Sequence, residues 1–193
     1  MKIKNIALVG NPNCGKTSLF NTLTGTRQKV ANYAGVTVER KEGSFKLPSG
    51  DAIRVLDLPG TYSLKPSSLD EEVTRAVCLG ELKGEILPDI FICVVDATNL
   101  SLHLSLVLEV RALNRPMILV LNMMDEVKKR GISIDKDKLS QLLGIPVVEA
   151  VAVKTKGIQD LINQLDQKNL FITPYHAELS HFEQVKQITK QVI

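Results

Sequence analysis

The chain has 193 residues, of which 44% are hydrophobic, and its 24 basic and 21 acidic side chains give a formal net charge of +3. This length can bury one substantial core, so we expect one domain with an appendage. Because charges of both signs are interspersed, they create no strong field for nucleic acid or an anionic membrane, and no nucleic-acid partner is expected. No apolar run approaches the roughly 20 residues that cross a bilayer, and the first residues lack a signal-peptide pattern, which predicts a soluble chain.

The cysteine and histidine residues show no spacing typical of a metal site. The three cysteines are Cys14, Cys78 and Cys93, and the three histidines are His103, His176 and His181. An odd number of cysteines without a CxxC pair argues against a disulfide framework or a zinc site and favours a reducing compartment. Each histidine is interpreted as a lone surface side chain.

Short apolar runs alternate with helical patterns along the chain, which predicts an α/β fold with a mostly parallel sheet. A buried strand is predicted at residues 3–9, followed by a helix at residues 16–24 that Gly25 ends. Residues 38–47 and 52–56 flank a turn that is too short for a crossover, so these two strands should pair antiparallel. The sheet is therefore expected to carry one antiparallel edge strand.

The same alternation continues in the second half of the chain. Residues 90–95 and 117–121 are apolar without interruption, as strands covered on both faces are, and they should be central in the sheet. A last strand at residues 145–151 and a helix at about residues 158–165 complete the sheet. After residue 174 a helical pattern runs to residue 193, and its apolar side chains need a partner. These side chains are Leu179, Phe182, Val185 and Ile188.

The predicted first strand and first helix are joined by a phosphate-loop motif, GxxxxGK followed by Ser or Thr. The motif comprises Gly10, Asn11, Pro12, Asn13, Cys14, Gly15, Lys16 and Thr17, and Ser18 follows it in the helix. Its glycines let backbone N–H groups face the phosphates, and the helix N-terminus adds the positive end of its dipole. Lys16 would reach the outer phosphates and Thr17 would bind magnesium. We count all these residues as nucleotide contacts; the alternative is a glycine-rich turn without a ligand.

Two short motifs each follow directly after a predicted strand, DxxG at residues 57–60 and NxxD at residues 122–125. Both would lie at the carboxyl edge of the sheet, where α/β proteins bind ligands. Asp57 would hold magnesium through its water shell, and the Gly60 N–H would sense a γ-phosphate. With Asn122 beside it, Asp125 would accept hydrogen bonds from the ring N–H and the amine of guanine, which selects GTP over ATP. The alternatives are a turn residue for Asp57 and a helix N-cap for Asp125.

Residues 27–36 have no clear period and predict a mobile loop that ends at Thr37. The Thr37 hydroxyl would complete the magnesium shell only while the γ-phosphate is present, so the loop would act as a nucleotide-dependent switch. Gly35 and Val36 are counted with it as nucleotide contacts, and the alternative for Thr37 is an ordinary threonine at a strand edge. On the other side of the base, a backbone N–H after the last strand would meet the guanine carbonyl oxygen. The residues expected there are Ala152, Val153 and Lys154.

In this order, the motifs resemble those of the translation-factor-like GTPases. The strings at residues 10–21, 35–43, 57–64 and 95–99 resemble the N-terminal G domain of the ferrous-iron transport protein B family (FeoB). The resemblance covers roughly residues 1–166 and implies a three-layer P-loop GTPase fold, with a G domain at residues 1–168 and the start of a truncated helical domain at residues 169–193.

The same resemblance implies a place in the cell and a set of partners. The chain would be a GTP-binding switch on the cytoplasmic face of the bacterial inner membrane, regulating a ferrous-iron permease that lies in the same polypeptide. Small cytosolic regulators and oligomers formed through the membrane part are further partners that it implies. The expected cofactors are GTP or GDP, Mg²⁺ and K⁺.

Three residues depart from the patterns of related GTPases. Met123 stands where many carry a lysine that packs over the base, which implies a modest nucleotide affinity, and we still count Met123 as a base contact. Ala152 stands where relatives often have a serine that braces the base, which implies fast GDP release. Thr61 follows Gly60 in place of the glutamine that positions the attacking water in Ras-like enzymes, so intrinsic hydrolysis should be slow.

Asn13 offers one compensation for the missing glutamine. In potassium-activated relatives that the motif resembles, the corresponding asparagine helps to hold a monovalent cation that offsets charge in the transition state. The alternative is that Asn13 only shapes the loop, because asparagine favours such turns. Together with Asn13, the groups expected to act on the reaction are Lys16, Thr37 and Gly60.

Three other functions remain open at this point. A soluble GTPase of ribosome assembly or tRNA modification would carry the same nucleotide motifs, although the chain shows no basic patch for RNA. A P-loop kinase acting with ATP would leave Asn122 and Asp125 unexplained. The third alternative is a binding module in which GTP hydrolysis is incidental.

Overall fold

A computed structural model describes residues 3–150, 155–167, 174–175 and 180–193, with no side chains described for residues 155–157. The strands are β1 (Asn5–Val9), β2 (Gln28–Asn32), β3 (Glu39–Lys46), β4 (Ala52–Asp57), β5 (Ile90–Asp96), β6 (Met117–Asn122) and β7 (Val147–Glu149). The helices are α1 (Lys16–Thr24), α2 (Leu69–Leu79), the short 3-10 helix η1 (Ala97–Asn99), α3 (Leu100–Ala112), α4 (Met124–Lys129), α5 (Lys136–Leu143), α6 (Thr155–Asp166) and α7 (His181–Val192).

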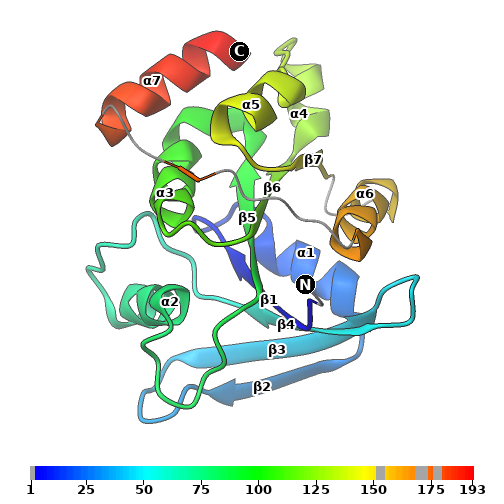
Figure 1. Cartoon of the computed structure of the whole chain (residues 1–193), viewed down its shortest axis with the longest axis vertical. Coiled ribbons are helices and arrows are strands. Elements are labelled where there is room, and N and C mark those ends of the chain that lie inside the picture. Colours follow the sequence, from blue (N-terminus) through cyan, green and yellow to red (C-terminus); the bar gives the residue numbers. More distant parts are fainter. Residues whose placement is uncertain (1–2, 151–154, 168–173, 176–179) are drawn as a thin grey trace.

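These strands form one sheet in the order β2-β3-β4-β1-β5-β6-β7, with helices on both faces (Figure 1). From β4 to β7 all neighbours are parallel, with registers such as Leu8 opposite Asp57 and Asp96 opposite Asn122. The carboxyl ends of β1, β4, β5 and β6 therefore meet at one edge, where the predicted motifs follow them. The α/β class with a mostly parallel sheet is confirmed.

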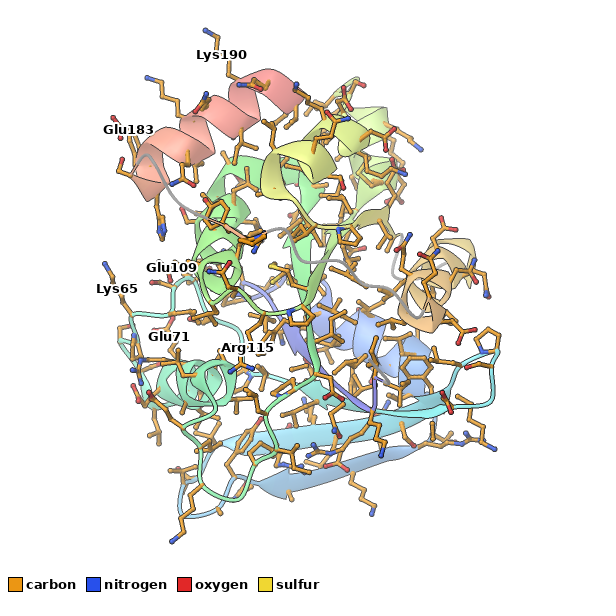
Figure 2. All side chains as sticks on the ribbon, viewed as in Figure 1. Lys65, Glu71, Glu109, Arg115, Glu183 and Lys190 are labelled. Atoms are coloured by element: carbon orange, nitrogen blue, oxygen red, sulfur yellow. The ribbon has the colours of Figure 1, made fainter. Side chains whose placement is uncertain are left out.

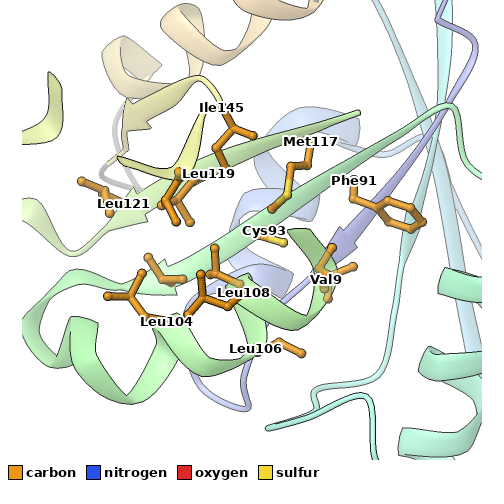
Figure 3. Close-up of a cluster of buried hydrophobic side chains, with 14 of the residues drawn as sticks. Val9, Phe91, Cys93, Leu104, Leu106, Leu108, Met117, Leu119, Leu121 and Ile145 are labelled. Carbon is orange, nitrogen blue, oxygen red and sulfur yellow. The ribbon is translucent and has the colours of Figure 1, made fainter. Parts of the chain in front are cut away.

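Two hydrophobic clusters cover the two faces of the sheet because side chains alternate along each strand. Ile6 and Leu8 of β1 join α1 and α6 on one face, whereas Ala7 and Val9 join α2, α3, α5 and α7 on the other. Figure 3 shows part of the second cluster, in which side chains of β5 and β6 lie against α3. Burial on both faces explains why β5 and β6 are apolar without interruption.

The predicted antiparallel pairing of residues 38–47 with residues 52–56 is confirmed, as β3 with β4, but a further strand that was not predicted lies outside this pair at the edge of the sheet. Residues 28–32, expected in a mobile loop, form β2, which pairs antiparallel with β3. β3 in turn pairs antiparallel with β4, so it is the strand that runs against the others, but it is not at the edge. All five residues of β2 are exposed, Val30 to 62%. The strand therefore carries no alternation of buried and exposed residues that a sequence pattern can reveal.

His103 is also placed differently from the prediction. It lies on α3 with only 5% of its surface exposed, and its Nδ1 has no hydrogen-bond partner among the described residues. α3 is buried along most of its length, and His103 lies on it next to the buried Leu104. This burial lowers the pKa of His103. The interpretation as a surface histidine is therefore wrong for His103. His181 is half-buried, and His176 lies outside the described residues.

The C-terminal helix α7 packs on the same core as the sheet. Ser180 and Glu183 form a capping box at its start, and Ile188 joins the cluster beside α3 and α5. Val185 packs against this cluster, as predicted, but Phe182 is 78% exposed, so its predicted burial is wrong; Leu179 lies outside the described residues. The division into domains at residues 168 and 169 stays a prediction.

Arg111 attaches the segment before α7 to this core. Its guanidinium is buried, donates from Nε to the carbonyl oxygen of Leu143 at 2.9 Å, and lies 5.2 Å from the ring centroid of Tyr175. The Tyr175 N–H donates to Asn114 Oδ1 at 2.9 Å. A cation over an aromatic ring that also donates a hydrogen bond to a carbonyl oxygen is a stable way to bury an arginine.

Candidate functional site

The phosphate loop lies between β1 and α1 in a conformation that its residues require. Gly15 (φ +89°) and Asn13 (φ +62°) both have left-handed backbone, which glycine and asparagine tolerate best. A Cβ atom on Gly15 would lie 2.0 Å from Asn122 Nδ2, and one on Gly10 would lie 2.4 Å from the carbonyl oxygen of Val94. Both glycines are therefore needed for close approach to the sheet.

The end of β6 supports this loop from behind. Asn122 is buried, and its Nδ2 donates to the carbonyl oxygen of Cys14 at 2.9 Å. The NxxD and phosphate-loop motifs, 108 residues apart, are thus joined by a direct hydrogen bond. Burial raises the pKa of the Cys14 thiol, which lies in the loop as a free cysteine.

Asp57 contacts two residues of α1. Lys16 Nζ lies 3.0 Å from Asp57 Oδ1, and the Thr17 hydroxyl donates to Asp57 Oδ2 at 3.1 Å. The Lys16 and Asp57 side chains are only 9% and 4% exposed. A carboxylate and a hydroxyl at this spacing are the hard oxygen donors that Mg²⁺ prefers in phosphate sites. The donor set therefore fits the predicted metal.

A pocket of about 240 Å³ opens beside this cluster. Its lining includes four of the predicted site residues, Lys16, Thr17, Asp57 and Gly60. Three charged residues that line it were not predicted, namely Glu39, Lys41 and Asp70. Asp70 lies in the first turn of α2, where acidic residues are common for local reasons, so its sequence position alone did not mark it.

The proposed switch threonine does not line this pocket. Thr37 is exposed, in a turn closed by hydrogen bonds from Tyr33 N to Val38 O at 3.0 Å and from Val36 N to Tyr33 O at 3.2 Å. Gly35 has the left-handed backbone (φ +79°) that this turn uses. Contact between Thr37 and magnesium stays a prediction, and it calls for a rearrangement of this turn.

Gly60 packs directly on the phosphate loop. A Cβ atom on Gly60 would lie 3.0 Å from the Pro12 nitrogen, and the Thr61 N–H donates to the carbonyl oxygen of Gly10 at 3.2 Å. The Thr61 side chain is fully buried and its hydroxyl donates to the Ser63 carbonyl oxygen at 2.6 Å. This hydroxyl therefore does not replace the missing glutamine.

Two carboxylates that sequence reasoning missed hold the segment after Gly60. Glu71 of α2 accepts from the N–H and the hydroxyl of Ser67 at 2.8 and 2.7 Å, and the hydroxyl bond lowers its pKa. Glu109 of α3 accepts from the Ser63 hydroxyl at 2.9 Å and from the Leu64 N–H. Figure 2 labels both carboxylates on their helices. The segment at residues 61–67 is thus bonded to two helices rather than to the sheet.

The predicted base-binding residues are only partly described. Asp125 is half-buried in the first turn of α4, and the N-cap of this helix is Met123 (φ +61°), so the alternative of an N-cap role for Asp125 is wrong. Ala152, Val153 and Lys154 lie outside the described residues. The contacts of all five residues with a base stay predictions.

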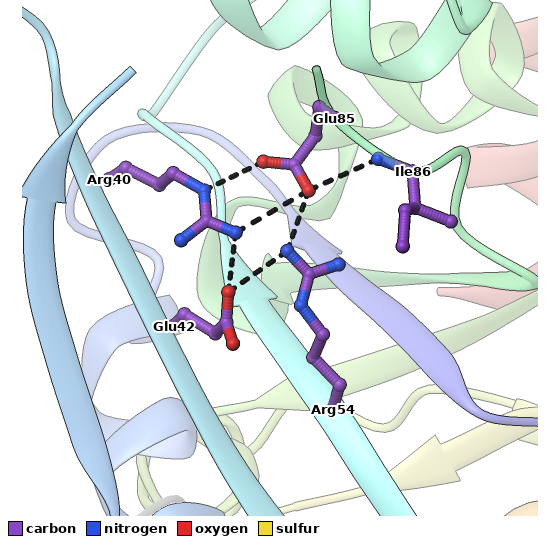
Figure 4. A network of polar contacts seen from close by, with 5 residues as sticks. All are labelled: Arg40, Glu42, Arg54, Glu85 and Ile86. Carbon is purple, nitrogen blue, oxygen red and sulfur yellow. Dashed lines mark hydrogen bonds and ion pairs between the residues drawn. The ribbon is translucent and has the colours of Figure 1, made fainter. Parts of the chain in front are cut away.

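A charged network ties β3 and β4 to the loop before β5 (Figure 4). Glu85 pairs with Arg40 at 2.7 Å and with Arg54 at 2.6 Å, and Glu42 pairs with both arginines. Although burial acts in the opposite direction, the hydrogen bonds from Arg40 and Arg54 lower the pKa of Glu85. The network fixes the strand pair that carries Asp57.

Four features define a domain of the α/β P-loop class. They are a phosphate loop, an adjoining lysine–aspartate pair, a DxxG glycine packed on the loop and an NxxD asparagine bonded to it. Within this class, the family model for ferrous iron transport protein B matches residues 4–165. The chain therefore belongs to the ferrous iron transport protein B family.

Individual relatives agree with this assignment. The Fe(2+) transporter FeoB of Salmonella typhimurium is 46% identical over 188 residues, which are 95% of this chain but 23% of the relative. The cytosolic domain of L. pneumophila FeoB superposes with a TM-score of 0.88 at 33% identity, covering 98% of this chain and 99% of that one. The GMPPNP form of the T. maritima FeoB cytosolic domain gives a TM-score of 0.78 at 43% identity, covering 91% and 69%.

These relatives favour the iron-transporter family over the soluble GTPase of ribosome assembly or tRNA modification. The chain spans about a quarter of the length of the curated relatives that it matches. No helix in the described part of the chain is both long and apolar enough to pass through a membrane.

Proposed function

We propose that this chain binds GTP together with Mg²⁺ and hydrolyses it to GDP and phosphate. The observation that carries the proposal is the buried contact of Asp57 with Lys16 and Thr17 at the mouth of the pocket that Gly60 lines. The GMPPNP and GDP forms of the T. maritima relative support a guanine nucleotide as the ligand.

Each residue of the cluster has a role that follows from its chemistry. The Lys16 ammonium, now bonded to Asp57, would contact the outer phosphate oxygens as a point charge. Thr17 and Asp57 would hold Mg²⁺, which, when bound, neutralises charge on the phosphates. The Gly60 N–H would donate to the γ-phosphate. Position 60 has no room for a side chain, because a Cβ atom there would lie too close to Pro12. The Thr37 hydroxyl would join after its turn rearranges.

We propose K⁺ as an additional activator that acts through Asn13. The Asn13 side chain is exposed on the phosphate loop, held in a left-handed turn. An amide oxygen in this position is a suitable ligand for a monovalent cation beside the triphosphate. The buried, engaged hydroxyl of Thr61 supports the need for such a group, because it cannot position water.

The coverage of relatives supports a larger assembly. Since the chain matches about a quarter of each FeoB relative, we propose that a membrane permease lies in the same polypeptide and that this domain regulates its Fe²⁺ transport from the cytoplasmic face of the inner membrane. Small cytosolic regulators and oligomers formed through the membrane part belong to the same proposal.

The decisive experiment measures phosphate release from GTP and from ATP, with Mg²⁺ and with a chelator. We expect release from GTP alone, dependent on Mg²⁺, and loss of release in Lys16→Ala. The control is Lys136→Ala, which removes a lysine from the start of α5, away from the pocket. GTP hydrolysis that survives in Lys16→Ala, or equal rates with ATP, would rule the proposal out.

A further inference from the structure

The Asn11 side chain has an unusual environment for an amide. It is only 2% exposed, yet neither its Nδ2 nor its Oδ1 has a hydrogen-bond partner among the described residues. The other buried asparagine of the site, Asn122, donates to Cys14, and Asn13 is exposed. Burying an amide without partners is unfavourable, so such groups in folded proteins call for an explanation.

The backbone on both sides of Asn11 contacts the segment after β4. Gly10 accepts from the Thr61 N–H at 3.2 Å, and the Pro12 nitrogen is 3.0 Å from where a Gly60 Cβ would lie. Asn11 thus lies between the two loop residues that meet Gly60 and Thr61. The next backbone donor of that segment, the Tyr62 N–H, makes a long hydrogen bond of 3.5 Å to Glu71.

We propose that Asn11 is a positioning residue whose carboxamide binds the backbone of residues 60–62 in the triphosphate state. The inference rests on the proposed function, because the Gly60 N–H must turn toward the γ-phosphate for this state to form. Its movement breaks or bends the present bonds of residues 61 and 62, and the buried carboxamide supplies a donor and an acceptor for the new arrangement. With its backbone held in this way, the segment orients the attacking water without a glutamine.

Asn11→Leu tests the proposal because leucine has the branched shape of asparagine without its polar atoms. A buried amide that lacks partners can be replaced by an apolar group of the same shape at little cost. We therefore expect the melting temperature of the chain, alone and with GDP, to be unchanged or higher. We also expect binding of a non-hydrolysable GTP analogue to be weakened about tenfold more than GDP binding, and kcat for GTP to be about tenfold lower.

The control is Asn163→Leu, which changes an exposed asparagine on α6. A lower melting temperature with equal losses of GDP and analogue binding would show that Asn11 has a structural role and would overturn the inference. Unchanged analogue binding and kcat would overturn it as well. Asn11→Ala is the second variant, and failure of both variants to fold counts against the inference. If the wild-type chain binds neither nucleotide, the proposed function itself is wrong. The other outcomes contradict only the role of Asn11.

Discussion

Lys16 and Asp57 form a buried ion pair with 3.0 Å between Nζ and Oδ1, although 41 residues separate them in the chain. The pair joins the start of α1 to the end of β4, two elements that meet only because β1 and β4 are parallel neighbours. The ammonium and the carboxylate that we propose to act on phosphate and metal are thus held together by the sheet itself.

Asp57→Asn is expected to abolish the effect of Mg²⁺ on nucleotide binding. An amide keeps the shape of the side chain but lacks the charge that holds the metal. GDP affinity should rise at least about tenfold with Mg²⁺ in the wild type and remain nearly constant in the variant, as measured by titration with a fluorescent nucleotide. Asp160→Asn, on the exposed face of α6, is the control. A variant that still responds to Mg²⁺ like the wild type would contradict the assignment.

Asp125→Asn is expected to shift base preference from guanine toward xanthine. The carboxylate accepts two hydrogen bonds from guanine, whereas an amide also presents a donor, which matches the carbonyl of xanthine. Competition between GDP and xanthosine diphosphate measures the change, and we expect a reversal of about a hundredfold or more. Glu126→Gln, the next residue of α4, is the matched control because it removes a carboxylate bonded to Lys129. Unchanged GDP affinity in Asp125→Asn would disprove base recognition by this residue.

Thr37→Ala and Thr17→Ala should separate the two nucleotide states. Thr37 lies outside the pocket, so its loss should spare GDP binding and slow GTP hydrolysis roughly tenfold or more. Thr17 contacts Asp57 directly, so its loss should weaken GDP and GTP binding alike. Affinities for both nucleotides and single-turnover hydrolysis give the comparison. Equal loss of GDP and GTP binding in Thr37→Ala would contradict the switch role.

Hydrolysis is expected to be faster in potassium than in sodium at the same ionic strength. An arginine finger gives a thousandfold or more, so a cation held by Asn13 should give at least about tenfold. Steady-state rates for the wild type and Asn13→Ala in the two salts provide the test, with Asn163→Ala as a control on α6. Stimulation that persists undiminished in Asn13→Ala would remove Asn13 from the mechanism.

His103 is expected to make the folded chain less stable in weak acid. Because burial lowers its pKa, the unfolded chain binds a proton more readily than the folded one, although Asp96 nearby acts in the opposite direction. The stability contribution is therefore complete above the unfolded pKa, about 6.5, and is lost as the pH falls through the folded pKa. Melting temperatures between about pH 7.5 and 5 should fall less steeply in His103→Leu than in the wild type. His181→Leu is the control, and an equal change in both variants would contradict the role of His103.

Much of the fold could be predicted from the sequence because the local sequence patterns agree with the tertiary structure. The bounds of α1 are those predicted, since the phosphate loop begins the helix and Gly25 ends it. β5 and β6 were found because burial on both faces demands apolar residues. β2 was missed because it is held by backbone hydrogen bonds to β3 and buries none of its side chains.

The residues of the candidate site likewise fall into two groups, those that the sequence predicts and those that it does not. Lys16, Thr17, Asp57 and Gly60 belong to motifs with a fixed spacing, and the structure brings them to one pocket. Glu71 and Glu109 belong to no motif. The residues that they bind are determined by how α2 and α3 pack against the segment at residues 61–67. The Asn11 amide has no hydrogen-bond partner in the described part of the chain, and this too results from packing, which the sequence of the motif does not specify.

The exposed edge strand has a consequence for self-association. No described strand pairs with the outer side of β2, so a row of backbone N–H and C=O groups faces outward there, with Val30 at its centre. Such an edge can template a strand from another molecule, and natural proteins often block it with a lysine and by keeping the strand short. β2 has five residues and carries Lys29 beside Val30. Lys29 is the one charged residue of β2, so neutralising it should favour edge-to-edge aggregation.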